Sequence, residues 1–134
     1  MAKLEAVEGI GDTYAGKLRQ AKVRSTNDLL KKGSTPAGRK TIASDAGISP
    51  KLVLTWVNHV DLFRIKGVAS QYAELLEAAG VDTVVELAQR RPDALVEAMQ
   101  KTNDKKRLVR QVPALSQVQS WIEQAKKLPR QVSY

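Results

Sequence analysis

Apolar residues recur along this chain at helical spacing. Two stripes with the spacing i, i+4, i+7 stand out, namely Tyr14, Leu18 and Ala21 and then Tyr72, Leu76 and Ala79. Such a stripe covers one face of an α-helix and predicts that this face is buried. No segment alternates apolar and polar residues for long enough to indicate a strand. The pattern therefore predicts an all-α fold.

The two stripes belong to a longer internal repeat. Residues 7–30 recur as residues 65–88 with a shift of 58 positions, and 7 of the 24 aligned residues are identical. The identical pairs are Gly9/Gly67, Tyr14/Tyr72, Ala15/Ala73, Leu18/Leu76, Ala21/Ala79, Val23/Val81 and Leu29/Leu87. Each copy opens with a glycine turn, continues into a helix, turns tightly, and forms a second short helix that Ser25 or Thr26, and then Asp82 or Thr83, would cap. A shared register of this length predicts two copies of one structural unit.

The segment after the first copy predicts two further helices. Thr35 is expected to cap the first of them, with proline next to it, and Gly47 to end it. The second carries Trp56, and Trp121 occupies the matching place after the second copy with a shift of 65. About seven residues are therefore inserted in the second copy, and we place them near residues 101–107. Both tryptophans alternate with apolar residues, so we expect them in the core and not stacked on bases.

The length of the chain favours a single folded body. A chain of 134 residues is long enough for one compact core and short for two independent ones. We expect one domain over residues 1–134, with repeat one at about 1–62 and repeat two at about 62–134, related by an approximate two-fold axis. No apolar run approaches the roughly 20 residues that a membrane span needs, and the acidic start is unlike a signal peptide. A cytoplasmic location without membrane contact is therefore expected.

Composition argues against several kinds of chemistry. The chain has no cysteine, so it cannot form a disulfide or a thiolate metal site, and its single histidine, His59, has no Ser or second His at the spacing of a metal site or a catalytic triad. Paired carboxylates such as Glu74 and Glu77 are one turn apart on a predicted surface and do not form an acid–base couple. We therefore expect no enzyme activity, no catalytic residue, no metal, no cofactor and no small-molecule substrate.

The charge of the chain is positive and uneven. The formal net charge is +8. Residues 1–40 hold 9 Lys and Arg against 4 Asp and Glu, residues 41–100 hold 5 against 8, and residues 101–134 hold 8 against 2. Two basic ends around an acidic middle indicate a polyanionic partner such as nucleic acid, or a plainly solvated surface.

The pattern L-x-x-V-x-G-I-G-x-x-x-A-x-x-L from Leu4 to Leu18 resembles the helix-hairpin-helix motif. That resemblance implies two helix-hairpin-helix units with connecting helices in one pseudo-two-fold compact domain. It also implies that backbone amides of the glycine turn and the following helix bind a DNA phosphate without reading sequence, which the helix dipole favours.

This chain departs from the motif beside the turns. Asp12 stands next to the second glycine, where a carboxylate repels phosphate, and Ala69 replaces that glycine in the second copy. Glu74 and Glu77 follow on the second helix, so we expect the first turn to contribute more to any polyanion contact than the second. A turn kept for packing alone is the alternative for both copies.

Most of the chain also resembles a family of bacterial proteins grouped as a domain of unknown function with tandem helix-hairpin-helix units. The resemblance extends over stretches such as TPAGRKTIA, WVNHVDLFRIKGV and the closing WIEQAKKLPRQVSY. It implies the fold and brings no activity with it.

Residues 39–58 also scan as a helix-turn-helix. A recognition helix there would offer Lys51 for a phosphate and Asn58 for a base. We favour a corner where two helices pack, with sequence-specific reading as the alternative.

The leading hypothesis is a non-catalytic protein that binds the backbone of DNA, or less favourably RNA, independently of sequence. The candidate nucleic-acid-binding residues are Gly9, Ile10, Gly11, Lys17, Lys22, Gly67, Lys101, Lys105, Lys106, Arg107 and Arg110. The last five belong to a basic segment interpreted as a phosphate-tracking loop or a solvated connector. The rival hypothesis is an interaction module that uses the same scaffold to bind an unidentified protein.

Overall fold

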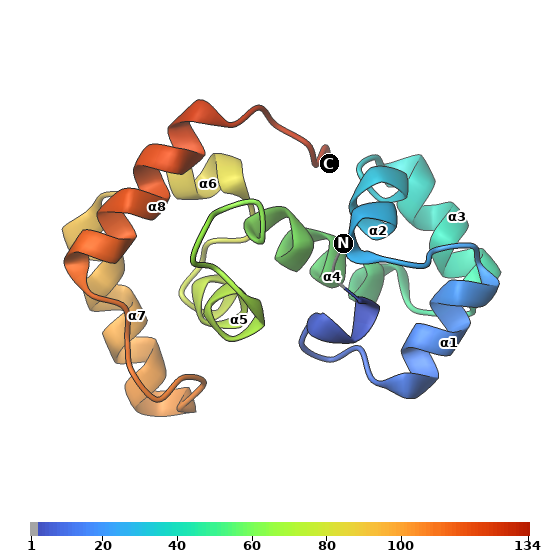
Figure 1. The fold of residues 1–134 in the computed structure, drawn as a ribbon, viewed down its shortest axis with the longest axis horizontal. Helices are drawn as coiled ribbons and strands as arrows, with labels where there is room; N and C mark the ends of the chain where they lie inside the picture. The colour runs from blue at the N-terminus through green and yellow to red at the C-terminus, as the bar shows by residue number, and fades with distance from the viewer. Residues whose placement is uncertain (1–2) are drawn as a thin grey trace. The chain divides into compact units, whose positions relative to one another are not determined.

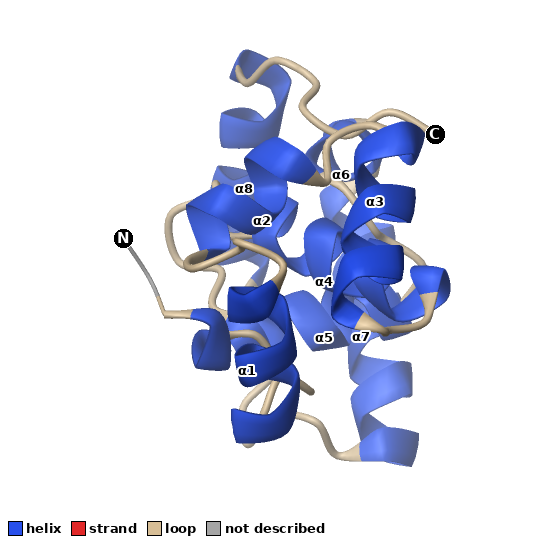
Figure 2. Cartoon of the chain, turned by 90° about the vertical axis from the view of Figure 1, so that its right-hand side faces the viewer, coloured by secondary structure: helices blue, strands red, loops and turns tan. Residues whose placement is uncertain are grey.

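The computed structural model describes residues 3–134 and shows a helical chain. Eight α-helices and one short 3-10 helix account for its regular structure, and no strand occurs within residues 3–134 (Figures 1 and 2). The predicted all-α class is confirmed. The chain divides into two compact units, of which unit 1 holds residues up to Asp61 together with Gln131–Tyr134, and unit 2 holds Leu62–Arg130. The approximate two-fold axis and the single domain stay predictions.

Unit 1 is built around four α-helices. The 3-10 helix η1 (Leu4–Ala6) precedes α1 (Asp12–Gln20), α2 (Thr26–Lys32), α3 (Pro36–Ala46) and α4 (Pro50–Leu62), whose last residue begins unit 2. Helix α1 packs against η1 and α3, and α2 packs against α3.

Unit 2 repeats the plan with α5 (Ser70–Ala78), α6 (Val84–Ala88), α7 (Pro92–Lys106) and α8 (Leu115–Lys127). Helix α8 packs against α6 and α7, and α5 packs against α7, so α7 and α8 lie side by side (Figure 1). The core of this unit is a cluster of buried apolar side chains that includes Leu76, Met99 and Trp121.

The helix boundaries locate the insertion in the second copy. Helices α1 and α5 have equal lengths and differ by 58 at both ends, and α4 and α8 differ by 65 at both ends. Pro36 and Pro92, which open α3 and α7, differ by 56. Two residues are therefore missing before α7 and nine are added after its start, through a longer helix and a longer connector. The insertion expected near residues 101–107 is confirmed and is larger than the net difference of seven.

Matching caps start the second helix of each copy. The Ser25 hydroxyl accepts from the Asp28 amide at 3.1 Å, and Asp28 accepts in return from the Arg24 amide. In unit 2 the Thr83 hydroxyl faces the Glu86 amide at 3.5 Å, and Glu86 accepts from the Asp82 amide. This reciprocal arrangement satisfies two amides that have no partner inside the helix. The structure thus selects Ser25 and Thr83 from the pairs that the sequence left open.

The ends of the first helices also match. Val23 donates to the Leu18 carbonyl at 2.9 Å, and Val81 donates to the Leu76 carbonyl at 2.8 Å. The residue before each valine is left-handed, with φ of 67° for Lys22 and 99° for Gly80. Such a residue closes a helix in the Schellman manner, and glycine is preferred there because it has no Cβ. The predicted role of Gly80 is confirmed.

The stripe residues are mostly buried as expected. Leu18, Leu76, Val23, Val81, Trp56 and Trp121 are at most 2% exposed, whereas Tyr14 and Tyr72 are half-buried. Both tyrosines are thus less buried than the other stripe residues, although each ring packs against a tryptophan. Their ring centroids lie 5.0 Å from Trp56 and 5.3 Å from Trp121. Both tryptophans belong to the core, as predicted.

The last four residues complete unit 1. Ser133 donates its amide to the Ser34 carbonyl at 2.8 Å, and its own carbonyl accepts from the Arg39 guanidinium at 2.7 Å. The Tyr134 hydroxyl lies 3.2 Å from the Asn58 side-chain oxygen. Asn58 is buried, so its side-chain amide is not available to contact a base. The helix-turn-helix alternative therefore lacks the residue that was expected to recognise one.

Candidate nucleic-acid interface

The first glycine turn, defined as Val7–Gly11, is a tight reversal between η1 and α1. The Ile10 amide donates to the Val7 carbonyl at 3.1 Å, and Gly9 has a φ of 92°. A positive φ at the third residue of such a turn favours glycine strongly. A Cβ on Gly9 would also lie 3.4 Å from Trp56 Nε1. The turn is therefore fixed by its backbone and by the tryptophan beneath it.

The second glycine turn, defined as Ile65–Ala69, reproduces this geometry. Val68 donates to the Ile65 carbonyl at 3.1 Å, and Gly67 has a φ of 96°. A Cβ on Gly67 would come within 3.0 Å of Trp121 Nε1. The Gln124 side chain adds a clamp, because its oxygen accepts from the Lys66 amide at 2.8 Å and its nitrogen donates to the Lys66 carbonyl.

Both turns lead into helices that begin without a side-chain cap. Gly11 and Ala69 are the N-cap residues of α1 and α5, and neither provides a side-chain hydrogen bond to the first amides of its helix. By contrast, Ser25, Thr35 and Thr83 cap α2, α3 and α6. The first amides of a helix have no acceptor inside it, so an uncapped exposed end offers donors to an anion.

The two glycines of the first turn have different structural roles. Gly11 has a φ of −91°, and a Cβ built on it meets no heavy atom of the described chain within 4 Å. Ala69 occupies the same place in unit 2 with nearly the same backbone angles. The fold therefore requires glycine at Gly9 and not at Gly11. Without a Cβ, Gly11 leaves the backbone of the turn open to close approach.

Charged side chains flank the two turns differently. Glu8 lies in the first turn and Asp12 opens α1, and both are exposed. The corresponding residues in unit 2 are Lys66 and Ser70. The second turn is therefore the more favourable of the two for an anion at these flanking positions. The sequence reasoning missed Lys66, which alignment of the two copies at the shift of 58 would have revealed.

The candidate cations of unit 1 lie along α1 and its C-terminal turn. The Lys17 ammonium lies 5.8 Å from the centre of the Tyr14 ring, and Lys22 is exposed. Lys32 donates its ammonium to the Lys22 carbonyl, and Arg90 donates its guanidinium to the Gly80 carbonyl at 2.7 Å. This repeated contact satisfies a carbonyl at the end of the first helix, so Lys32 and Arg90 have a structural role beside their charge.

The basic segment of unit 2 was expected to be a loop, and most of it is a helix. Lys101, Lys105 and Lys106 lie in α7, which ends at Lys106. Lysines are favoured at this end because they complement the negative end of the helix dipole. Lys101 also pairs with Glu97 at 3.2 Å, one turn earlier. The irregular connector begins only at Arg107, which is left-handed with a φ of 51°.

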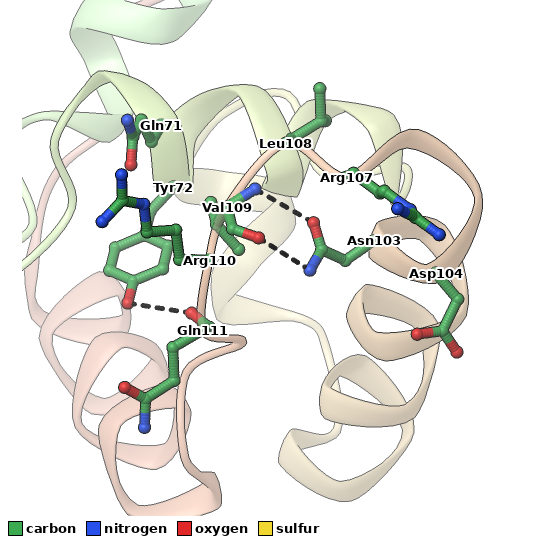
Figure 3. A pocket seen from close by; sticks show the side chains of 9 residues that line it. All are labelled: Gln71, Tyr72, Asn103, Asp104, Arg107, Leu108, Val109, Arg110 and Gln111. Carbon is green, nitrogen blue, oxygen red and sulfur yellow. Dashed lines mark hydrogen bonds between the residues drawn. The ribbon is translucent and has the colours of Figure 1, made fainter.

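Side-chain hydrogen bonds hold this connector at two points. The Asn103 side chain accepts from the Val109 amide and donates to the Val109 carbonyl, both at 3.0 Å (Figure 3). Two residues further on, the Tyr72 hydroxyl donates to the Gln111 carbonyl at 3.3 Å. Hydrogen bonds therefore link the connector to α7 through Asn103 and to α5 through Tyr72.

A polar pocket of about 840 Å³ lies between the start of α5 and this connector (Figure 3). Its lining consists of Gln71, Tyr72, Asn103, Asp104, Arg107, Leu108, Val109, Arg110 and Gln111. Of the predicted site residues, Arg107 and Arg110 both line this pocket, from opposite sides, next to the helix that the second glycine turn opens. Gln71, Tyr72 and Asn103 are lining residues that the sequence reasoning missed, since no spacing in the chain connects them.

The family to which the chain belongs follows from a comparison over most of its length. The model of the family described as domain of unknown function DUF4332 matches residues 8–128. The chain belongs to the DUF4332 family. No curated protein and no solved structure matches the chain. The family match covers the first glycine turn from Glu8 onward, the whole second turn, the basic end of α7 and the pocket.

Two searches of the described residues bear on other functions. No helix among residues 3–134 is long and apolar enough to cross a membrane. The same residues contain no group of three or more His, Asp or Glu side chains placed to hold a metal ion.

Proposed function

We propose that this DUF4332 chain is a non-catalytic protein that binds the phosphate backbone of duplex DNA through two helix-hairpin-helix units. The observation that carries the proposal is the repeated pairing of a left-handed glycine turn with an uncapped helix start, at Gly9 and α1 and again at Gly67 and α5. Two such ends in one chain provide two sets of backbone donors for phosphate oxygens. Donors of this kind recognise the backbone and carry no base information.

The charge of each unit supports the same partner. Unit 1 holds 10 Lys and Arg against 6 Asp and Glu, and unit 2 holds 12 against 8. Each unit therefore has a net charge of +4, although the sequence is acidic in its middle. A cation that neutralises a DNA phosphate releases a counterion, so binding of this type weakens as salt rises.

Fluorescence anisotropy of labelled duplexes over a potassium chloride series tests the proposal. We expect micromolar affinity at low salt, a linear fall of log K with log salt, and less than about threefold variation among unrelated sequences. A single-stranded RNA of equal length provides the comparison for the less favoured nucleic acid. The absence of binding at low salt with micromolar protein would exclude the proposal.

The second candidate function is a protein-interaction module. The observation that favours it is the pair of exposed carboxylates at the first turn, Glu8 and Asp12, which oppose a phosphate at that position. A basic partner protein would be attracted by the same charges. Under this alternative the anisotropy signal stays flat at low salt, while the folded protein retains both glycine turns.

A further inference from the structure

The most distinctive surface of the chain is the pocket between the start of α5 and the connector that is longer in the second copy. In unit 1 the connector between α3 and α4 is residues 47–49, whereas in unit 2 residues 107–114 connect α7 to α8. Only the longer connector reaches back to the start of α5, where Tyr72 binds it. The pocket is thus an addition to the repeated plan and does not follow from the glycine turn itself.

The connector presents two arginines from a fixed backbone. Arg107 and Arg110 are both exposed, and the residues between them include Val109, whose amide and carbonyl are held by Asn103. In Figure 3 Arg110 lies on the side of Gln71 and Tyr72, and Arg107 lies on the side of α7. A guanidinium offers five donors in a planar fork, which suits the oxygens of a phosphate group.

The remaining polar groups of the pocket are compatible with an anion. Its one carboxylate among the lining residues is Asp104, which accepts from the Gln100 side-chain amide at 2.9 Å. Two guanidinium charges therefore exceed one carboxylate charge. Arg107 also has a left-handed backbone, which is strained for a residue that carries a Cβ. Glycine would relieve this strain but would lose the guanidinium.

We propose that Arg107 and Arg110, on the two sides of this pocket, form a phosphate-binding site on a connector whose backbone is held in place by Asn103 and Tyr72. The site is separate from the backbone donors of the glycine turns. That the phosphate belongs to a nucleic-acid strand rests on the proposed function, whereas the phosphate site itself does not. Free phosphate and the backbone of DNA share the chemistry that the two guanidinium groups recognise.

The first experiment uses inorganic phosphate and the whole chain. An NMR titration with potassium phosphate, against potassium chloride at equal ionic strength, should shift the amides of residues 107–111 saturably. It should also shift the side-chain Nε signals of Arg107 and Arg110. The double variant Arg107→Gln/Arg110→Gln should lose these shifts. Equal shifts at the exposed Lys126 and Lys127 would show general attraction to cations and would overturn the site.

The second experiment measures DNA affinity with a matched control. Arg107→Gln/Arg110→Gln and Lys126→Gln/Lys127→Gln each remove two positive charges from unit 2. If both arginines neutralise phosphates, the first variant should lower the salt slope by about 2 and weaken binding about tenfold or more, and the lysine variant should change both much less. Equal losses in the two variants would remove the site from the DNA interface. Phosphate binding at residues 107–111 without any DNA binding would reject the proposed function and leave the phosphate site standing.

A third experiment separates the built pocket from charge alone. Asn103→Ala leaves the net charge unchanged and releases the connector from α7, so phosphate affinity should fall about fivefold while the thermal transition remains cooperative. Tyr72→Phe removes only the hydrogen bond to Gln111 and keeps the ring. It therefore provides the same test if the Asn103→Ala protein does not fold. Unchanged phosphate affinity in a folded Asn103→Ala or Tyr72→Phe protein would contradict the role of the connector.

Discussion

Gly67 lies so close to Trp121 that a Cβ on the glycine would come within 3.0 Å of the indole nitrogen. Gly9 and Trp56 repeat this contact in unit 1 at 3.4 Å. These contacts explain why both copies share a glycine in the turn and a tryptophan about fifty residues later, in the fourth helix of each copy. Each turn needs a glycine because the backbone is left-handed and because a tryptophan fills the space below.

This contact predicts unequal effects of two glycine substitutions. Gly67→Ala should lower the free energy of unfolding by about 1–3 kcal/mol, since alanine is strained at positive φ and its Cβ meets Trp121. Gly11→Ala should change it by less than about 0.5 kcal/mol, because Gly11 has an ordinary φ and open space. Urea titrations of both variants provide the comparison. A similar loss for both would mean that the second glycine also has a structural role.

The buried leucines of the first helices should matter equally in the two units. Leu18 and Leu76 are fully buried, and truncation of either to alanine should cost about 2–5 kcal/mol of unfolding free energy. Chemical denaturation monitored by tryptophan fluorescence is suitable because Trp56 and Trp121 report on one unit each. A loss under about half a kcal/mol would contradict a core position for that leucine.

The left-handed Lys22 is a position where the protein can be stabilised. Lys22→Gly should raise the free energy of unfolding by about 0.5–1 kcal/mol, because glycine adopts the φ of 67° without a Cβ clash. Lys22→Gln is the matched control, since it removes the same charge and keeps the strain. If the glutamine variant gains as much stability as the glycine variant, charge repulsion and not the backbone is responsible.

The carboxylate beside the first turn should oppose DNA binding. Asp12→Lys replaces a negative charge by a positive one at the start of α1, and we expect about three- to tenfold tighter binding at low salt. Asp45→Lys makes the same change in charge at an exposed position near the C-terminal end of α3, and it should have a smaller effect. Anisotropy at a fixed low salt concentration measures both. Equal gains would indicate that net charge alone determines the affinity.

The ion pair between Glu5 and Arg19 predicts a pH dependence of stability. Its atoms lie 3.0 Å apart, and the pKa of Glu5 is held below its ordinary 4.5 by its own backbone amide and then by Arg19. A carboxyl with a lowered folded pKa stabilises the protein above its unfolded pKa and loses this contribution as the pH falls. The stability difference between the wild type and Glu5→Gln should therefore be present at neutral pH and shrink from about pH 5 downward. A difference that grows on acidification would contradict the pairing.

Much of the local structure could be predicted from the sequence because short-range rules determine it. The caps by Thr35 and by Ser25, the stop at Gly47 and the role of Gly80 each depend on residues within one helical turn. The helical end of α7 was missed, since Lys101 to Lys106 carry no apolar stripe and the helix there is stabilised by charge and packing.

The candidate site was harder to predict because it depends on contacts between distant residues. Tyr72 and Gln111 are 39 positions apart, and no motif connects them. The length of the connector could not be deduced from the sequence either. The net difference of seven residues between the copies is the sum of a loss of two residues before α7 and a gain of nine after its start. Their charge alone identified Arg107 and Arg110 in the sequence, but the pocket that they both line could be recognised only from the fold.

The position of the last four residues in unit 1 has a consequence for the order of synthesis. Arg39 is 7% exposed, and its guanidinium donates to the carbonyls of Gly33 and Ser133. Arg39 is synthesised ninety-four positions before Ser133. In the nascent chain its guanidinium therefore lacks the Ser133 carbonyl as an acceptor until after α8 has been made. Unit 2 is continuous in the chain and depends on no later segment. The first unit therefore gains its full set of contacts only after the whole of the second unit has been synthesised, which reverses their order in the sequence.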